Sequence, residues 1–267
     1  MPTENNWLYS NLSDRLEDHS LDFKVFLSPI PITKMSFEKA AIESAFKIAN
    51  KYDRLFLAFS GGLDSEFILL LLKELKIEVT PLIINFQANA KEFNIAIEIC
   101  KKLNIEPVIL YFSEQDFFNE YLKRIFIPLN GIGINGTPFV LCKEYAAKHH
   151  AALISGEHMI DDDPFLLKVS MAEWDFYNDV VHNDAQSVGL LTYTPNIVYS
   201  IVKNFDGFSV QKTKSKLYNI TERLKYKPEY NKNISSLYNR LISKRKYKPA
   251  STMILGYRDE FLKVLEG

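Results

Sequence analysis

Residues 55–65 read LFLAFSGGLDS, five apolar residues followed by a turn that contains two adjacent glycines. An uninterrupted apolar run of this length is typical of a strand that is covered on both faces, as the strands of parallel sheets are. Glycines allow the backbone to turn sharply, and the apolar residues from Phe67 onward favour a helix after the turn. A strand, a tight turn and a helix in this order begin a β-α-β unit.

The same alternation of strands and helices continues on both sides of this segment. We expect helices over residues 36–50, 64–75, 90–103 and 137–150, and strands over residues 55–59, 79–86, 107–112 and 151–155. Four strands with helical crossovers imply an α/β fold with a doubly wound parallel sheet, which is Rossmann-like. Such sheets bind ligands at the carboxyl ends of their strands, so the loops after residues 59 and 155 are the candidate sites.

The charge of the chain is unevenly distributed along its length. The 267 residues carry a net charge of -1 and are 47% hydrophobic, as in an ordinary globular protein. Between Lys203 and Lys248, however, 13 basic and 3 acidic residues give +10, which leaves -11 for the rest of the chain. We expect an N-terminal extension over residues 1–34, an α/β domain over residues 35–200 and a mostly helical basic region over residues 201–267.

Several classes of protein are disfavoured by simple features of the sequence. The longest apolar run, Phe67 to Leu72, has six residues, far fewer than the roughly 20 that cross a bilayer. The first residues, MPTEN, resemble no secretory signal, so we expect a cytoplasmic protein without a membrane segment. Cys100 and Cys142 are too few for a disulfide framework or a four-thiolate zinc site, and we expect them to be buried as small hydrophobic residues.

The loop after the first strand has the composition of a phosphate-binding loop. Gly61 and Gly62 let the backbone approach a ligand closely, and the following helix presents its positive N-terminal end. Ser60 and Ser65 add hydroxyl donors, whereas Asp64 repels a bare phosphate unless Mg²⁺ bridges the two. The loop fits neither a Walker A nor a Gly-x-Gly-x-x-Gly pattern. The alternative, a simple N-capped turn, explains neither the paired glycines nor the preceding strand.

The motif Ser-Gly-Gly-x-Asp-Ser after a first strand resembles the loop of the PP-loop ATP pyrophosphatases, which include asparagine synthetase, 7-cyano-7-deazaguanine synthase and tRNA-lysidine synthase. The resemblance implies an adenine nucleotide alpha hydrolase-like fold and the use of ATP and Mg²⁺. The pyrophosphate would lie against Ser60, Gly61, Gly62, Leu63, Asp64 and Ser65. Among these, Asp64, Ser60 and Ser65 would be the catalytic residues. The adenine would lie near Ala58, Phe59 and Asn85, at the ends of the first two strands.

A second acidic loop follows the fourth strand and should face the same cleft. It reads SGEHMIDDD over residues 155–163, and it resembles the Ser-Gly-Glu-Gly-Ala-Asp segment of asparagine synthetases. The resemblance assigns Gly156 and Glu157 to the nucleotide and either Asp161 or Asp162 to the metal, because the expected Asp falls at Ile160. The alternative is an exposed acidic turn that ends before Pro164. His158 is a base, a substrate contact or a solvated bystander.

The basic C-terminal region allows three interpretations. Lysines that reach the triphosphate would stabilise charge on the leaving pyrophosphate, and the candidates are Lys212, Lys214 and Lys216, or Lys244 and Lys246. Tyrosines interleaved with the basic residues, as at Tyr226 and Tyr230, would instead suit RNA. A solvated helical face is the third interpretation.

These features favour an enzyme that adenylates a substrate oxygen with Mg-ATP, releases pyrophosphate and lets a nitrogen nucleophile displace AMP. Sulfur transfer is disfavoured because the paired cysteines of the thiolation enzymes are missing; Phe139 stands three residues before Cys142. An enzyme that modifies a tRNA base and a non-catalytic ATP- or AMP-binding module are the alternatives. The sequence leaves open the acceptor, which is a small molecule or a tRNA, the nitrogen donor and the oligomeric state, a homodimer included.

Overall fold

The computed structural model of the chain describes residues 8–10, 25–27, 31–85, 90–111, 113, 137–156, 187–203 and 210–220. Within these ranges the central feature is a five-stranded sheet of order β5-β4-β3-β6-β7. The strands are β3 (Leu55–Ala58), β4 (Thr80–Asn85), β5 (Val108–Tyr111), β6 (Ala152–Ser155) and β7 (Ser187–Gly189). Every neighbouring pair is parallel, so the expected doubly wound α/β sheet is confirmed.

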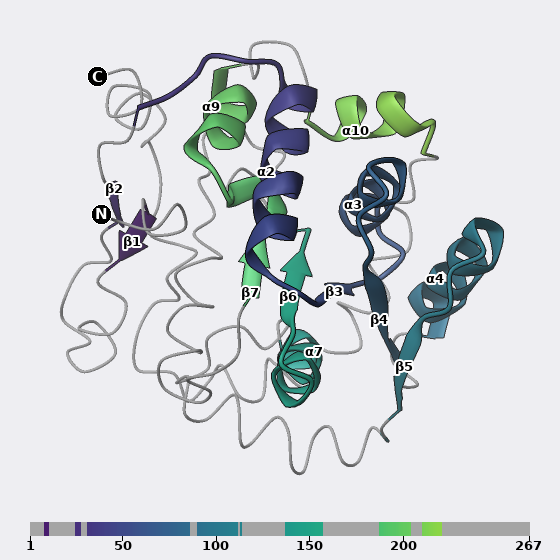
Figure 1. The fold of residues 1–267 in the computed structure, drawn as a ribbon. Coiled ribbons are helices and arrows are strands. Elements are labelled where there is room, and N and C mark those ends of the chain that lie inside the picture. Colours follow the sequence, from purple (N-terminus) through teal and green to yellow (C-terminus); the bar gives the residue numbers. More distant parts are fainter. Residues whose placement is uncertain are drawn as a thin grey trace, which may run out of the picture.

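Helices cover both faces of this sheet (Figure 1). They are α2 (Phe37–Lys51), α3 (Leu63–Glu74), α4 (Ala90–Leu103), α7 (Thr137–Lys148), α9 (Pro195–Lys203) and α10 (Val210–Tyr218), with the 3-10 turn η4 (Leu190–Thr192) before α9. One face packs against α2, α3, α4 and α9, and the other packs against α7. Helices on both faces shield the sheet as a parallel sheet requires.

The alternation of side chains along β3 explains why its sequence is apolar throughout. Leu55 and Leu57 point into the larger core with α2 and α3, whereas Phe56 points into the smaller core with α7. Leu57 is completely buried and Phe56 is 1% exposed. Because successive side chains of a strand face opposite sides, both faces of β3 must be apolar.

The expected helices and strands agree with the structure to within about two residues at each end that the structure describes. Helix α2 begins after Ser36, whose hydroxyl accepts a hydrogen bond from the Lys39 amide at 3.4 Å. Three strands were missed by the sequence pattern. Strand β7 has three residues, of which Val188 is buried, and a segment this short shows no periodicity. Strands β1 (Leu8–Ser10) and β2 (Val25–Leu27) form a separate antiparallel pair within the expected N-terminal extension.

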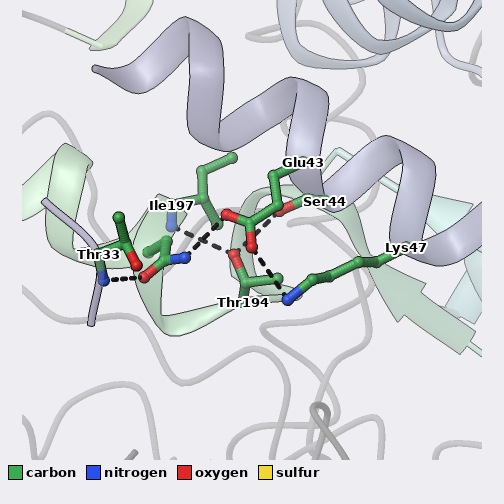
Figure 2. A network of polar contacts seen from close by, with 7 residues as sticks. Thr33, Glu43, Ser44, Lys47, Thr194 and Ile197 are labelled. Atoms are coloured by element: carbon green, nitrogen blue, oxygen red, sulfur yellow. Dashed lines mark hydrogen bonds and ion pairs between the residues drawn. The ribbon is translucent and has the colours of Figure 1, made fainter. Parts of the chain in front are cut away.

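A network of polar contacts fixes the start of α9 against α2 (Figure 2). The Asn196 side chain accepts a hydrogen bond from the Thr33 amide at 2.9 Å and donates one to Glu43 at 2.8 Å. The hydroxyls of Ser44 and Thr194 lie 3.1 Å apart in a buried position. Burial tends to raise the pKa of Glu43, but hydrogen bonds from Asn196 and Lys47 outweigh it and lower this pKa. The network therefore holds the carboxylate charged and fixes α9.

Replacing Asn196 tests this network. Asn196→Ala leaves the Thr33 amide and the Glu43 carboxylate without this partner in a partly buried place, which should lower the free energy of unfolding by about 1–3 kcal/mol. Asn94→Ala is the matched control, because Asn94 is exposed on α4 and its loss should change the stability by about 0.5 kcal/mol or less. Urea unfolding measures both, and equal stability of the two variants would contradict the role of the network.

Candidate functional site

The two candidate loops begin side by side, at the carboxyl ends of the neighbouring strands β3 and β6. The chain leaves β3 through residues 59–62 into α3, and it leaves β6 through Gly156. β3 and β6 are neighbours in the sheet although nearly 100 residues separate them, and the connections from them run in opposite directions. This is the topological switch point, where doubly wound sheets form a crevice for ligands.

The glycine turn is followed immediately by the N-terminus of α3. Gly62 is the N-cap residue, with φ -77° and ψ 161°, and the helix begins at Leu63. The first-turn amides of a helix have no acceptor within the helix, and its N-terminus carries a partial positive charge. A twelve-residue helix that begins directly after the turn therefore suits a phosphate group.

Gly61 fits its position only because it lacks a side chain. Its φ is +69°, and a Cβ atom there would lie 2.8 Å from the Ala96 amide nitrogen. The loop is thus seated against the backbone of α4, a contact that the sequence did not indicate. Both the positive φ and the close approach favour glycine.

The two serines of the loop lie in different environments. The Ser60 hydroxyl is exposed and accepts a hydrogen bond from the Gly62 amide at 3.3 Å. The Ser65 hydroxyl belongs to a residue that is 5% exposed, and it donates to the Gly62 carbonyl at 3.0 Å. Ser65 therefore stabilises the turn through a hydrogen bond to its backbone, while Ser60 lies on the solvent side. Contact of either hydroxyl with phosphate stays a prediction.

Asp64 forms an ion pair with a lysine from the far end of the described chain. The Lys214 ammonium lies 2.5 Å from Asp64 Oδ1, and the lysine side chain is completely buried while the aspartate side chain is 26% exposed. Lys214 is one of the lysines that the sequence offered for the triphosphate. Residues two apart on a helix point in nearly opposite directions, so Lys212 and Lys216 are exposed while Lys214 points inward.

Two further contacts dock α10 onto α3. The Tyr218 hydroxyl donates a hydrogen bond to Glu74 at 2.6 Å, and the Tyr218 and Phe67 rings pack in a T-shaped arrangement with their centres 5.6 Å apart. Burial and the Glu74 carboxylate raise the pKa of Tyr218 above its usual value. These contacts hold Lys214 at the N-terminus of α3, and no local sequence pattern predicts them.

Gly156, the first residue after β6, lies against the first loop. A Cβ atom at Gly156 would lie 3.0 Å from Asp64 Cβ and 3.1 Å from the Ser65 amide nitrogen. The preceding residue, Ser155, is 4% exposed at the end of β6. The expectation that the two loops face the same crevice agrees with this geometry.

The residues expected at the adenine lie at the ends of neighbouring strands. Ala58 and Asn85 are half-buried at the carboxyl ends of β3 and β4. Phe59 is 3% exposed, and its amide donates to the Leu82 carbonyl at 2.9 Å. Its side chain belongs to the core, so any contact with adenine would use other backbone atoms.

Some of the expected site residues lie outside the described residues. They are Glu157, His158, Asp161, Asp162, Asp163, Lys244 and Lys246. Among the residues that the structure does describe, no group of three or more His, Cys, Asp or Glu side chains forms a potential metal site. Asp64 is the expected metal ligand whose surroundings are described.

The two cysteines do not have the surroundings of reactive, nucleophilic thiols. Both are free and buried, as expected from the sequence. Burial raises the pKa of the Cys100 thiol to about 11 and that of the Cys142 thiol to about 12. A reactive cysteine needs a thiolate at neutral pH, so neither thiol suits sulfur transfer.

In the part of the chain that the structure describes, every helix is too short or too polar to cross a membrane.

Part of the chain matches the model of a known protein family. Residues 52–158 match the family model described as asparagine synthase, and they include both the glycine turn and Gly156. No curated protein sequence matches the chain.

Several solved structures are similar to this chain at low sequence identity. One from Methanocaldococcus jannaschii, described as a predicted subunit of tRNA methyltransferase, has 19% identity and a TM-score of 0.42, and the match covers 69% of this chain and 88% of that one. NMN synthetase from Francisella tularensis has 17% identity and a TM-score of 0.37, with 80% and 98% covered. NH₃-dependent NAD synthetase from Campylobacter jejuni has 18% identity and a TM-score of 0.38, with 87% and 94% covered.

Three glycine substitutions test the geometry of the two loops. Gly61→Ala should lower the free energy of unfolding most, by about 2–4 kcal/mol, because of its positive φ and its contact with backbone. Gly156→Ala should lower it by about 1–3 kcal/mol, because the added methyl group meets the backbone at Asp64 and Ser65.

Gly62→Ala is the matched control. Its Cβ atom would approach the Ser60 hydroxyl, a movable group, at 3.3 Å, so we expect a loss of about 1 kcal/mol or less. Urea unfolding gives the order of the three variants. A Gly156→Ala protein as stable as the wild type would show that the second loop does not lie against Asp64.

Proposed function

We propose that this chain, whose residues 52–158 match the asparagine synthase family model, is an ATP-dependent ligase of the PP-loop ATP pyrophosphatase type. In the proposed reaction an oxygen of the substrate attacks the α-phosphate of ATP, and pyrophosphate leaves. A nitrogen nucleophile then displaces AMP and forms an amide or amidine.

The observation that carries this proposal is the meeting of Asp64, Gly156 and Lys214 at the N-terminus of α3. The amides of the first turn of α3 suit the phosphates of a nucleotide. Lys214 places a positive charge beside them, where charge develops on the departing pyrophosphate. A site that is arranged in advance stabilises that charge without reorganisation during the reaction.

The residues of the site fit a magnesium ion. Asp64 offers a partly exposed carboxylate at the turn, and carboxylate and phosphate oxygens are the ligands that Mg²⁺ prefers. We assign a second ligand to Asp161 or Asp162, from the acidic loop that follows Gly156. When bound, the ion would offset part of the negative charge of the triphosphate and help to orient its phosphates.

The choice of nitrogen over sulfur rests on the cysteines. A thiol displaces AMP only as a thiolate, and burial raises the pKa of both thiols far above neutral pH. The described part of the chain therefore offers no cysteine poised for persulfide chemistry. Ammonia or an amine from outside the chain is the nucleophile that we propose.

A tRNA base is the second candidate for the acceptor. Lys212 and Lys216 are exposed on α10, on the side opposite Lys214, and both belong to the segment of net charge +10. Exposed lysines beside the nucleotide site would hold a phosphate backbone. Binding of total tRNA that weakens steeply with salt, and weakens further in a Lys212→Gln/Lys216→Gln protein, would support this acceptor. Absence of binding at low salt would eliminate it.

The products of ATP consumption test the proposed reaction. Incubation of the protein with Mg²⁺, labelled ATP, ammonium and a panel of carboxylic acids or total tRNA should yield AMP and pyrophosphate. Asp64→Asn should reduce the rate by at least about a hundredfold, because it removes a charged group at the phosphates. Asp53→Asn, a change at an exposed residue before β3, is the control and should leave the rate unchanged.

Other products would contradict the proposal. Formation of ADP and phosphate would exclude pyrophosphate release. Tight binding of Mg-ATP with no turnover of any acceptor would favour a non-catalytic nucleotide-binding module instead.

A further inference from the structure

Lys214 occupies the position at Asp64 where the proposed site would receive a cation. We propose that in the nucleotide-free protein the Lys214 ammonium takes the place of the metal ion, so that a divalent cation enters only together with the nucleotide. This inference rests on the proposed Mg-ATP site and adds to it an order of binding. The contact that carries it is the 2.5 Å ion pair between Lys214 Nζ and Asp64 Oδ1.

The Lys214 side chain is completely buried, so water does not reach this ion pair from the side of the lysine. An ammonium that is completely buried needs a compensating negative charge, and Asp64 supplies one. On another side Gly156 lies directly against Asp64, with its Cβ position 3.0 Å away. The carboxylate thus lies between Lys214 of α10 and Gly156, and 26% of its side chain remains exposed.

Two cations at one carboxylate repel each other strongly. A divalent ion bound to Asp64 would lie a few ångströms from the Lys214 ammonium, in a partly buried place where water screens poorly. The N-terminus of α3 adds further positive potential at the same point. A bare divalent ion therefore meets an ion pair that is already neutral and a helix end that repels it.

The nucleotide removes this obstacle because it brings several negative charges. Its phosphates can accept the Lys214 ammonium while the metal ion takes the Asp64 carboxylate, so each cation gains its own anion. The lysine stem is long and flexible, which allows this exchange by a side-chain movement. Helix α10 can remain in place, because the Tyr218 to Glu74 hydrogen bond and the Tyr218 to Phe67 ring contact do not involve Lys214.

Charge removal at Lys214 tests the inference with Mn²⁺ as the probe. Free and bound Mn²⁺ are counted by electron paramagnetic resonance in the absence of nucleotide. Lys214→Met keeps the aliphatic stem and removes the charge, and it should bind Mn²⁺ at least about tenfold more tightly than the wild type does. Adding Asp64→Asn to this variant should abolish the gain.

Two matched variants control for other effects. Lys216→Met removes an exposed lysine two residues away and should bind Mn²⁺ as weakly as the wild type. Lys214→Arg retains a positive charge and should also exclude Mn²⁺. If Lys214→Met does not fold, Lys214→Gln gives the same comparison, with circular dichroism and thermal unfolding checking each protein.

The outcomes separate this inference from the proposed function. No gain of Mn²⁺ binding in a folded Lys214→Met protein, or Mn²⁺ binding to the nucleotide-free wild type that Asp64→Asn removes, would overturn the inference. If the wild type still binds Mn-ATP and releases pyrophosphate in that case, the proposed function survives. Failure of the wild type to bind Mn-ATP at all would overturn both.

Discussion

The burial of β3 on both faces is the constraint on which the rest of the structure depends. Its side chains alternate between the core formed with α2 and α3 and the core formed with α7, which places the strand at the centre of the sheet. A strand in that position has neighbours on both sides, β4 and β6, and its carboxyl end lies at the switch point. The glycine turn and Gly156 therefore lie together because of the packing of β3 and β6 beneath them.

Much of the fold follows from the sequence because hydrophobic period and turn residues are local signals. Helix α4 coincides with its expected range, and the cap at Ser36 was visible from residue types alone. Strand β7 was not predictable in this way, since three residues with one buried valine carry no period. Its place in the sheet comes from pairing with β6, which is a tertiary effect.

In the candidate site, too, the residues of a local motif could be predicted from the sequence, whereas the contact with a distant residue could not. The turn at Ser60 to Ser65 is one continuous motif, so its position and its polar side chains could be predicted from the sequence. The lysine that completes it was not, because three lysines at alternate positions on α10 are equivalent until the packing of that helix on α3 selects one of them. Ser65 shows a third case: its hydroxyl is directed at the backbone of the turn, and only the structure reveals that contact.

The ion pair between Asp64 and Lys214 joins residues 150 positions apart. We expect a contact of such separation to form late in folding, because the entropy of closing a long segment of chain must be lost before the contact stabilises the protein. Any molecule that binds at the N-terminus of α3 more tightly when α10 is docked will stabilise the docked state of α10, so occupancy of the proposed site and the order of this helix are thermodynamically linked.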